Sequence, residues 1–404
     1  METFPPVNEQ MDLIRRGVNE IISEEELEHK FDRSFQEGKP LIVKLGCDPS
    51  RPDLHIGHAV VLRKLRQFQD LGHRAVLVVG DFTATIGDPS GTNKTRPQLS
   101  AHETKRYGKT YVDQASVILD PDTLEVVTNS SWLGAMNFHD VIRLASHYTV
   151  ARMLERNDFE KRYESGTPIS IHEFLYPLAQ AMDSIELHAD VELGGTDQKF
   201  NLLLARDLQR DYEQPPQVVI TTLLLEGTDG VQKMSKSYGN TIGITESAGE
   251  MYGKTLSIPD TLIVRYFELA TDISSTELEL VKGQLSDRSV NPRDLKRRLA
   301  REIVRLYHSE ESALEAEREF DRVFVAKEVP EEVESFSVDS SPVNIVQLLF
   351  DAGLVSSRRE ARRLIDQGAV RVDGERVTDI SFKLDVKMER ILKVGKRRFL
   401  KVTP

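Results

Sequence analysis

Two continuous apolar runs separated by a helical segment constrain the fold of this chain most. Residues 41–45 (Leu-Ile-Val-Lys-Leu) and 75–80 (Ala-Val-Leu-Val-Val-Gly) are typical of strands buried on both faces of a parallel sheet. A loop with Gly46 and Pro49 follows the first run, and residues 59–71 then mix apolar and basic positions as an amphipathic helix does. This order predicts a βαβ unit, whose ligands bind at the carboxyl ends of its strands.

A pair of histidines follows the first of these strands, in the run Leu54-His55-Ile56-Gly57-His58. If a helix starts there, both imidazoles share one face near its N-terminus, where free backbone N–H groups and the helix dipole favour an anion. Gly57 has no side chain, so a flat ring could lie against the backbone there. The alternative is a histidine pair that only satisfies the start of a helix.

A second short run, Lys233-Met234-Ser235-Lys236-Ser237, offers two lysines three residues apart. Small hydroxyl residues lie between them and Gly239 follows, as a mobile cationic loop would need. Taken alone, such a run is usually a solvated turn. Together, the histidines and the lysines predict a triphosphate held from two sides, with stabilisation of the charge that develops as pyrophosphate leaves.

In this order, the two runs resemble the HIGH and KMSKS signatures of class I aminoacyl-tRNA synthetases. That family activates an amino acid with ATP and Mg²⁺ to an aminoacyl-adenylate and then transfers the acyl group to tRNA. The resemblance narrows to the bacterial tyrosyl-tRNA synthetases and covers nearly the whole chain. It implies L-tyrosine, ATP and tRNA(Tyr) as partners, and a homodimer. Four further segments carry it: 46–50, 87–91, 176–183 and 194–198.

One helix face supports that resemblance chemically. Tyr176, Gln180 and Asp183 stand at positions i, i+4 and i+7, which is one face of a helix. Apolar neighbours such as Leu178 argue against a solvated face, and polar groups in a core need partners. A zwitterion with a phenol at its far end supplies partners for all three side chains.

The resemblance also implies which residues meet which substrate atoms. Asp183 accepts from the phenol, and Gln198 lies near the carboxylate. The α-ammonium is held by Asp88, Tyr176 and Gln180. The ATP side is lined by Gly46, Asp48, Gly57, Gly195, Asp197 and Lys236. The residues around the phosphates and the transition state are Ser50, His55, His58, Lys233 and Lys236.

One position departs from the family pattern. In the best-known branch a tyrosine precedes the stretch Cys-Gly-Phe-Asp and shares the phenol contact with the aspartate. The matching residue here is Lys44. Its ammonium could donate to the phenol oxygen and pair with Asp183, which is a different contact, so the second phenol ligand stays open.

The implied reaction needs neither a side-chain nucleophile nor a metal site in the protein. The tyrosine carboxylate attacks the α-phosphate in line, and the enzyme supplies positioning and charge stabilisation. We expect Mg²⁺ to travel with ATP, because it is seldom held in an all-protein carboxylate cage. Cys47 is the only cysteine, which excludes an internal disulfide and a cysteine-rich zinc site.

Charge is distributed unevenly along the chain, whose net charge is −12. Residues 343–404 hold 14 basic and 8 acidic residues, a net of +6, which leaves 39 against 57, or −18, for the rest. Such asymmetry indicates a basic RNA-binding appendage. Residues 357–374 resemble the RNA-binding fold named after ribosomal protein S-four. The expected phosphate contacts are Arg358, Arg359, Arg362 and Arg363, unless this is an ordinary basic surface helix.

The chain of 404 residues should therefore divide into several parts. We expect an α/β architecture: a Rossmann-like parallel-sheet catalytic domain, an α-helical domain on the anticodon side of the tRNA, a linker, and a small α+β RNA-binding domain. The corresponding ranges are 1–232, 233–330, 331–342 and 343–404. Within the first, residues 12–37 are expected as a helix and 217–220 as a strand.

We also expect a cytoplasmic location, and three rival functions are less consistent with the sequence. No apolar run reaches the length of a membrane span, and the first ten residues do not resemble a secretory signal, so we expect a cytoplasmic protein. One rival is an RNA-binding module that has lost its chemistry, but the lysine loop is complete. A small-molecule nucleotidyltransferase is typically smaller and lacks the basic tail. The tryptophanyl sister enzyme shares the fold, but Asp183 favours tyrosine.

Overall fold

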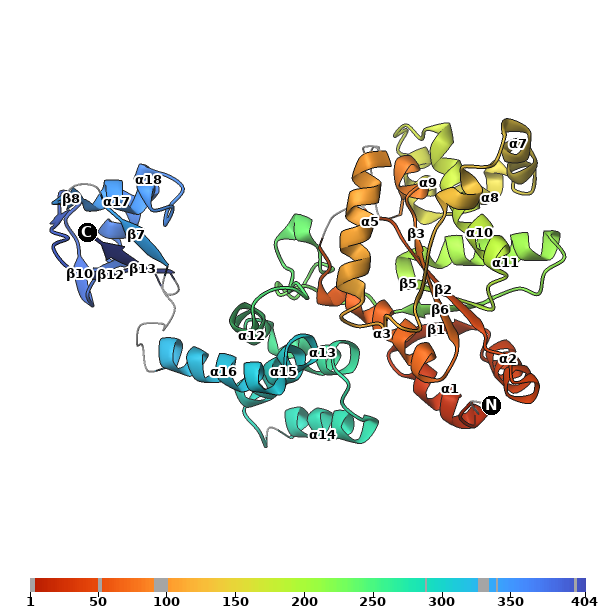
Figure 1. Cartoon of the computed structure of the whole chain (residues 1–404), viewed down its shortest axis with the longest axis horizontal. Helices are drawn as coiled ribbons and strands as arrows, with labels where there is room; N and C mark the ends of the chain where they lie inside the picture. The colour runs from red at the N-terminus through yellow and green to blue at the C-terminus, as the bar shows by residue number, and fades with distance from the viewer. Residues whose placement is uncertain are drawn as a thin grey trace. The chain divides into compact units, whose positions relative to one another are not determined.

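The computed structural model describes residues 4–49, 53–90, 101–287, 289–325, 334–338, 341–395 and 398–404. Figure 1 shows their path from the N-terminus to the C-terminus. The chain contacts divide it into two units, Met1–Leu314 and Glu315–Pro404. Each unit has its own sheet.

The sheet of the first unit has the strand order β1-β6-β5-β2-β3-β4 within the described residues. Its parallel strands are β2 (Ile42–Cys47), β3 (Arg74–Val79), β4 (Glu125–Thr128), β5 (Val191–Gly195) and β6 (Val218–Thr222). The edge strand β1 (Val18–Ile22) pairs antiparallel with β6. The three strands expected from the sequence are β2, β3 and β6, so the prediction of a parallel sheet is confirmed.

The strand order changes direction between β2 and β5. From β2 the chain adds β3 and β4 on one side of the sheet, and β5 and β6 lie on the other side. Ligands of open parallel sheets bind at such a switch point, outside the carboxyl ends of the strands. The helix α3 (Ile56–Asp70) begins there and packs against β2, β3 and β5. This confirms the expected βαβ unit.

Helices surround this sheet (Figure 1). Besides β4, the helices between β3 and β5 are α4 (Thr83–Ile86), α5 (Ala101–Ala115), α6 (Ser130–Leu133), α7 (Phe138–Ser146), α8 (Val150–Leu154), α9 (Asn157–Glu164), η1 (Ile171–Phe174) and α10 (Leu175–Leu187). The helix α11 (Lys199–Asp211) packs against α10, β5 and β6. A core cluster joins α10 and α11 to α6, α7 and α8 through side chains such as Leu133, Leu144, Met153 and Leu204.

The expectation of a single helix over residues 12–37 is wrong. The segment forms α1 (Val7–Arg15), the strand β1 and α2 (Glu24–Glu37). Gly17 adopts a φ of +64°, which ends α1, and Ser23 accepts a hydrogen bond from the Glu26 N–H and starts α2. The apolar, β-branched residues of 18–22 gain ladder hydrogen bonds along β6, and this pairing outweighs helix propensity.

The chain after β6 is mostly helical, as expected. A short turn, η3 (Lys236–Tyr238), precedes α12 (Ala248–Leu256), α13 (Ile263–Ala270), α14 (Ser275–Ser286), α15 (Pro292–Tyr307) and α16 (Glu310–Phe320). Asn291 accepts a hydrogen bond from the Arg293 N–H at the start of α15, and proline stands at its first position. None of the helices among the described residues is long and apolar enough to cross a membrane.

The second unit is a small α+β fold. Its main sheet has the order β10-β9-β12-β13-β7, and β8 (Val343–Asn344) pairs with β11 (Lys383–Leu384). The helices are α17 (Ile345–Asp351) and α18 (Arg358–Asp366). The expected Asp-Gly turn joins β9 (Val370–Val372) to β10 (Glu375–Val377), with φ values of 47° at Asp373 and 87° at Gly374.

One strand of this unit lies inside the range 331–342 that we expected to be a linker. β7 (Ser335–Ser337) pairs in parallel with β13 (Arg398–Thr403), whose other neighbour is β12 (Arg390–Val394). This pairing satisfies backbone groups that an exposed edge of β13 would leave open. The sequence of β7 is short and serine-rich, so only its partner strand makes it a strand.

Candidate active site

The histidine pair stands where α3 begins. His55 occupies the N-cap position of α3, its ring stacks on His58 with centroids 3.8 Å apart, and its backbone N–H donates to His58 Nδ1 at 3.3 Å. The His55 ring is buried, and its Nδ1 has no hydrogen-bond partner among the residues that the structure describes. Burial, with the His58 and Lys236 charges nearby, lowers the pKa of His55 to about 2. The ring is therefore neutral at physiological pH and offers a hydrogen bond instead of a positive charge.

The lysine run lies against this helix start. The Ile56 N–H donates to the Ile242 carbonyl at 2.9 Å, and the Ile244 N–H donates to the Leu54 carbonyl at 3.2 Å. A Cβ at Gly57 would lie 3.0 Å from His55 Nδ1 and 3.3 Å from Met234 Cβ. Glycine at this position thus lets the buried methionine of the lysine run approach the histidines. The structure brings together two motifs that are far apart in sequence.

Both lysines of the run pair with carboxylates around the site. Lys236 forms an ion pair with Asp53, and Lys233 Nζ lies 3.4 Å from Asp197 Oδ2. All four side chains are partly exposed, so water and salt screen these pairs and each contributes little free energy. Phosphate oxygens can therefore replace the carboxylates at low cost.

The side chain of Asn240 organises the same run from inside. Asn240 is buried, its Oδ1 accepts from the Ser235 N–H at 2.8 Å, and its Nδ2 donates to Asp229 Oδ2 at 2.8 Å. Gly239, with a φ of +64°, gives the chain its turn before Asn240. One amide thus holds two points of the loop that carries the lysines.

Asp183 of α10 is buried among polar side chains. Its Oδ1 accepts from Trp132 Nε1 at 2.9 Å, and its Oδ2 accepts from Asn129 Nδ2 at 3.4 Å. Burial raises the pKa of Asp183 to about 7, although the Lys44 charge and these two donors act against the shift. The carboxylate is therefore oriented and retains lone pairs for a further donor, such as a phenol.

Asp48 links the end of β2 to the same helix. The Tyr176 hydroxyl donates to Asp48 Oδ2 at 2.9 Å, and Thr83 Oγ1 donates to Asp48 Oδ1 at 2.7 Å. Burial is the main cause that raises the pKa of Asp48 to about 7, and the neighbouring Asp88 and Asp183 raise it further. A Cβ at Gly80 would collide with Asp48 Oδ1. Glycine at residue 80 therefore leaves the carboxylate its place.

A chain of amides connects the remaining expected tyrosine contacts. Gln198 Nε2 donates to Asp88 Oδ2 at 3.0 Å. Asn201 Nδ2 donates to Gln198 Oε1 at 3.1 Å and to Gln180 Oε1 at 3.0 Å. These hydrogen bonds bring Asp88, Gln180 and Gln198 together.

The expected pairing of Lys44 with Asp183 needs a correction. The Lys44 ammonium lies 2.9 Å from Glu192 Oε1, and it donates to Ser184 Oγ and to the Gln180 carbonyl. An ammonium has three donors, so none remains for a phenol. The cause is the sheet: Lys44 and Glu192 are direct neighbours in the register of β2 and β5.

The other expected residues fall into three groups. Ser50 lies outside the described residues. At the end of β5, a Cβ on Gly195 would lie 2.7 Å from Asp197 Oδ1, and no atom of the described part of the chain comes within 4 Å of a Cβ on Gly46. The four arginines of α18 are all exposed in the second unit, where the Arg358 guanidinium lies over the Phe350 ring at 5.4 Å: Arg358, Arg359, Arg362 and Arg363.

Sequence reasoning missed the residues that hold the expected ones in place. They are Asp53, Gly80, Thr83, Asn129, Trp132, Glu192, Asn201 and Asn240. Trp132 carried a usable signal, because it is the only tryptophan and a buried indole N–H needs an acceptor. Apart from Gly80, the others are ordinary polar residues, and most of them have partners that are distant in sequence.

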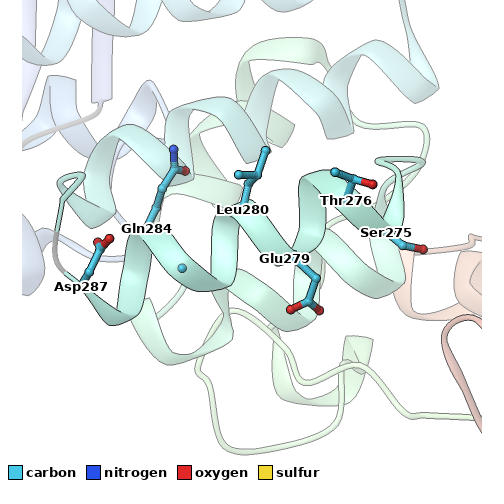
Figure 2. A pocket seen from close by; sticks show the side chains of 7 residues that line it. Ser275, Thr276, Glu279, Leu280, Gln284 and Asp287 are labelled. Atoms are coloured by element: carbon cyan, nitrogen blue, oxygen red, sulfur yellow. The ribbon is translucent and has the colours of Figure 1, made fainter.

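Two other features do not belong to this site. Among the described residues, no group of three or more His, Cys, Asp and Glu side chains is arranged to hold a metal ion. A hollow along α14 is shown in Figure 2. Its lining contains no lysine, arginine or histidine, and so offers no cation to a phosphate: Ser275, Thr276, Glu279, Leu280, Gly283, Gln284 and Asp287.

The parallel sheet, the histidines at the start of α3 and the adjoining lysine loop define a class I aminoacyl-tRNA synthetase. Residues 36–325 match the tRNA synthetases class I (W and Y), and residues 343–391 match the S4 domain. With its full-length relatives, described next, the chain belongs to the tyrosine–tRNA ligase family.

Relatives of the chain are similar along their whole length. The tyrosine–tRNA ligase of Salinibacter ruber is 56% identical over 406 residues, which is 99% of this chain and 98% of the relative. The corresponding ligase of Thermotoga maritima is 55% identical over 395 residues, or 98% and 97%. Among solved structures, tyrosyl-tRNA synthetase complexed with L-tyrosine from Archaeoglobus fulgidus has a TM-score of 0.63 at 23% identity, covering 77% of this chain and 99% of that one. This likeness shows the fold.

Proposed function

We propose that the site described above activates L-tyrosine with ATP to tyrosyl-adenylate and pyrophosphate, and then transfers tyrosine to the 3′ end of tRNA(Tyr). The observation that carries this proposal is the buried Asp183 carboxylate, oriented by Trp132 and Asn129. A buried acceptor fixed in this way suits a phenol. It disfavours phenylalanine, which would leave the acceptor unpaired, an argument for which this enzyme family is itself the standard example.

The tyrosine zwitterion is proposed to lie between α10 and the end of β2. Its phenol donates to Asp183, and its ammonium is held by Tyr176, Gln180 and Asp88. Burial is the main cause that raises the pKa of Tyr176, and the carboxylates of Asp48, Asp88 and Asp183 raise it further, which supports a negative potential where the ammonium would lie. Gln198, bonded to Asp88, is proposed to lie near the substrate carboxylate.

ATP is proposed to lie across the start of α3, with its ribose at Gly195 and Asp197. Gly46 and Asp48 line the same pocket, and a flat ring lies against the backbone at Gly57. The tyrosine carboxylate attacks the α-phosphate in line. His55, His58 and Ser50 are proposed to meet the phosphates, and the lysines leave Asp53 and Asp197 to stabilise the departing pyrophosphate. Mg²⁺ would arrive with ATP, whose phosphate oxygens are its preferred ligands.

The division of labour along the chain is also a proposal. Residues 1–232 carry catalysis, 233–330 the lysine loop and the helices on the anticodon side, and 343–404 RNA binding, with β7 of the range 331–342 as part of the RNA-binding unit. The exposed arginines of α18 support the last assignment. A cytoplasmic location is proposed because tRNA and ATP are consumed there.

A homodimer is proposed from the exposed apolar side chains between β4 and α10. Phe138, Ile142, Val150, Tyr163 and Ile171 are 80%, 54%, 63%, 69% and 82% exposed. So many large exposed apolar side chains in one segment are typical of an interaction surface, and a second copy of this chain is the proposed occupant. Light scattering at micromolar concentration should give twice the chain mass, and Ile171→Glu should reduce it. A monomer before substitution would contradict the proposal.

The test of the activity is exchange of labelled pyrophosphate into ATP with a panel of amino acids. We expect exchange with tyrosine alone. Exchange with tryptophan, or without any amino acid, would overturn the proposal. Asp183→Ala is expected to abolish the preference for tyrosine over phenylalanine, because it removes the acceptor of the phenol.

A further inference from the structure

A fully buried polar cluster lies beneath α10. The Lys44 ammonium is 2.9 Å from Glu192 Oε1, and neither side chain is exposed. The ammonium also donates to Ser184 Oγ at 2.6 Å and to the Gln180 carbonyl at 3.1 Å. Glu192 accepts from Ser184 Oγ at 3.0 Å, from Gln180 Nε2 at 3.1 Å and from Gln217 Nε2. All donors of the ammonium are thus used, and both carboxylate oxygens are bonded.

The register of the sheet creates this ion pair. Lys44 of β2 and Glu192 of β5 are direct partners in a parallel ladder at the switch point of the sheet. Directly paired residues of neighbouring strands point to the same face. The two charges are therefore held side by side by the backbone, below the helix that carries the tyrosine contacts.

The cluster forms several hydrogen bonds with one turn of α10. Gln180 and Ser184 are four residues apart, so they lie one above the other on the helix, and Asp183 lies within the same turn. Gln180 is bonded through both its carbonyl and its side chain, and Ser184 bridges the two charges. Any shift of the ion pair would move the turn from which Asp183 projects.

We propose that the buried Lys44–Glu192 pair is a positioning pair for tyrosine recognition: it fixes the α10 turn so that Gln180 and Asp183 face the amino acid. Lys44 is a positioning residue here and not a ligand of the phenol, because its donors are occupied by the protein. The inference rests on the proposed assignment of Asp183 and Gln180 to the tyrosine.

Stability gives a poor account of such a pair. Burying two charges costs desolvation free energy that their attraction barely offsets, and a neutral pair of similar volume is often at least as stable. The cluster nevertheless uses charged and polar groups from β2, β5 and α10, all directed at one helical turn. A role in placing that turn explains why charge is used there.

The test is the double substitution Lys44→Met/Glu192→Gln, which keeps the volumes and removes both charges together. We expect a folded enzyme by circular dichroism and thermal melting. In tyrosine-dependent pyrophosphate exchange, KM for tyrosine should rise about tenfold and the preference for tyrosine over phenylalanine should fall, while kcat changes by less than about threefold. A merely structural pair would leave both KM and the preference unchanged.

A second readout is the pH dependence of tyrosine affinity. The titratable groups that act on Asp183 are Lys44 of β2 and Glu192 of β5, and Asp183 in turn acts on Asp48 and Tyr176. The lysine has the larger influence on Asp183, and it favours the ionised carboxylate. Without the lysine, Asp183 should take up its proton at a higher pH. As the pH falls, the double variant should therefore lose tyrosine affinity at a higher pH than the parent does.

The matched control is Lys30→Met/Asp190→Asn, which neutralises a second ion pair at the amino end of β5. It should change neither the tyrosine KM nor the preference. If the double variant fails to fold, Ser184→Ala removes only the bridging hydroxyl and should raise KM in the same direction. Unchanged KM, preference and pH dependence in the double variant, or in Ser184→Ala if only that variant folds, would overturn the inference.

If Asp183 does not bind the phenol of tyrosine, the same variants give a different result. Asp183→Ala would then retain the parent preference for tyrosine over phenylalanine. Loss of preference in Asp183→Ala, with the parent preference in Lys44→Met/Glu192→Gln, would reject only the role of the ion pair. The two proposals are thus separated by one set of variants.

Discussion

At the scale of single residues, the site depends on carboxyl groups whose pKa is raised by burial. The pKa values of Asp48 and Asp183 rise from an ordinary 3.8 to about 7. Both groups are therefore partly protonated near neutral pH before tyrosine binds. The phenol would donate to ionised Asp183. The ammonium, proposed to lie at Tyr176, favours the ionised form of Asp48, which accepts from the Tyr176 hydroxyl.

The affinity for tyrosine should consequently fall as the pH drops below 7. Each proton taken up by Asp183 or Asp48 must be released on binding, so Kd should rise up to about tenfold per pH unit for one such group. Isothermal calorimetry between pH 5.5 and 8.5 measures this. In Asp183→Asn, one of the two titrations disappears and the slope should be shallower. A constant Kd over the range would show that neither carboxyl titrates there.

The same shifts act on stability in the opposite direction. A carboxyl whose pKa is raised in the folded state stabilises that state at low pH and loses this contribution as the pH rises through about 7. The ligand-free enzyme should therefore lose stability from these groups between about pH 4 and 7. The increase in Tm produced by tyrosine should be larger at pH 8 than at pH 6.

His55 and Lys236 are predicted to act on the transition state more than on tyrosine. The imidazole of His55 is neutral and close enough to Lys236 for the lysine charge to lower its pKa, and both are proposed to meet the phosphates. His55→Ala should lower kcat for pyrophosphate exchange by about 100-fold, as loss of one preorganised donor does, and Lys236→Ala should act in the same sense. Tyrosine Kd, measured by equilibrium dialysis, should be unchanged in both. An equal loss of tyrosine affinity would contradict these roles.

At the scale of elements, the lysine loop is held by contacts far from the lysines' charges. Asn240 bonds to the Ser235 N–H and to Asp229, and residues 242–244 pair with the chain around His55. The loop thus has a fixed base and exposed lysine tips. This arrangement lets the tips move from carboxylates to phosphates while the base stays in place.

Asn240→Ala should therefore lower kcat for activation without changing tyrosine affinity. The substitution leaves the Ser235 N–H and Asp229 without a shared partner, so the lysines lose their preorganised position. We expect about tenfold slower exchange. The control is Asn201→Ala, which removes hydrogen bonds from Gln180 and Gln198 and should instead raise the tyrosine KM. An unchanged kcat in Asn240→Ala would contradict this role.

At the scale of the whole molecule, the catalytic sheet and the arginine-rich helix α18 belong to separate units. The S4 domain match begins at residue 343, yet β7 already belongs to the sheet of the second unit. A truncation should therefore precede β7 and not follow it.

The chain ended at residue 325 should retain tyrosine-dependent pyrophosphate exchange and charge tRNA weakly. The second unit carries the four exposed arginines, which would neutralise phosphates and release counterions. Aminoacylation against salt concentration, for full-length and truncated chains, measures this. Full-length enzyme with Arg358, Arg359, Arg362 and Arg363 changed to glutamine is the matched control. Equal charging with the same salt slope would show that the tail is not the tRNA anchor.

The features that depend only on neighbouring residues could be predicted from the amino-acid sequence. Buried parallel strands need continuous apolar runs, so β2, β3 and β6 were predictable. The histidine pair indicated the start of α3. The Asp-Gly turn between β9 and β10 was predictable because both residues adopt positive φ readily. The residue types of the two signatures likewise indicated the chemistry before any fold was known.

The pairing of strands and of polar side chains from distant segments became visible only in the folded chain. The strand β1 was expected as helix, because its partner β6 is some 200 residues away and no local pattern reveals it. The contact of Lys44 was left open between the phenol and Asp183, and the register of β2 with β5 places its ammonium on Glu192. Trp132 and Asn129 orient Asp183 from a segment that is also distant in sequence, so these contacts were not predicted either. Hydrogen bonds and ion pairs between distant segments depend on strand order and register, which the side-chain pattern of one segment does not contain.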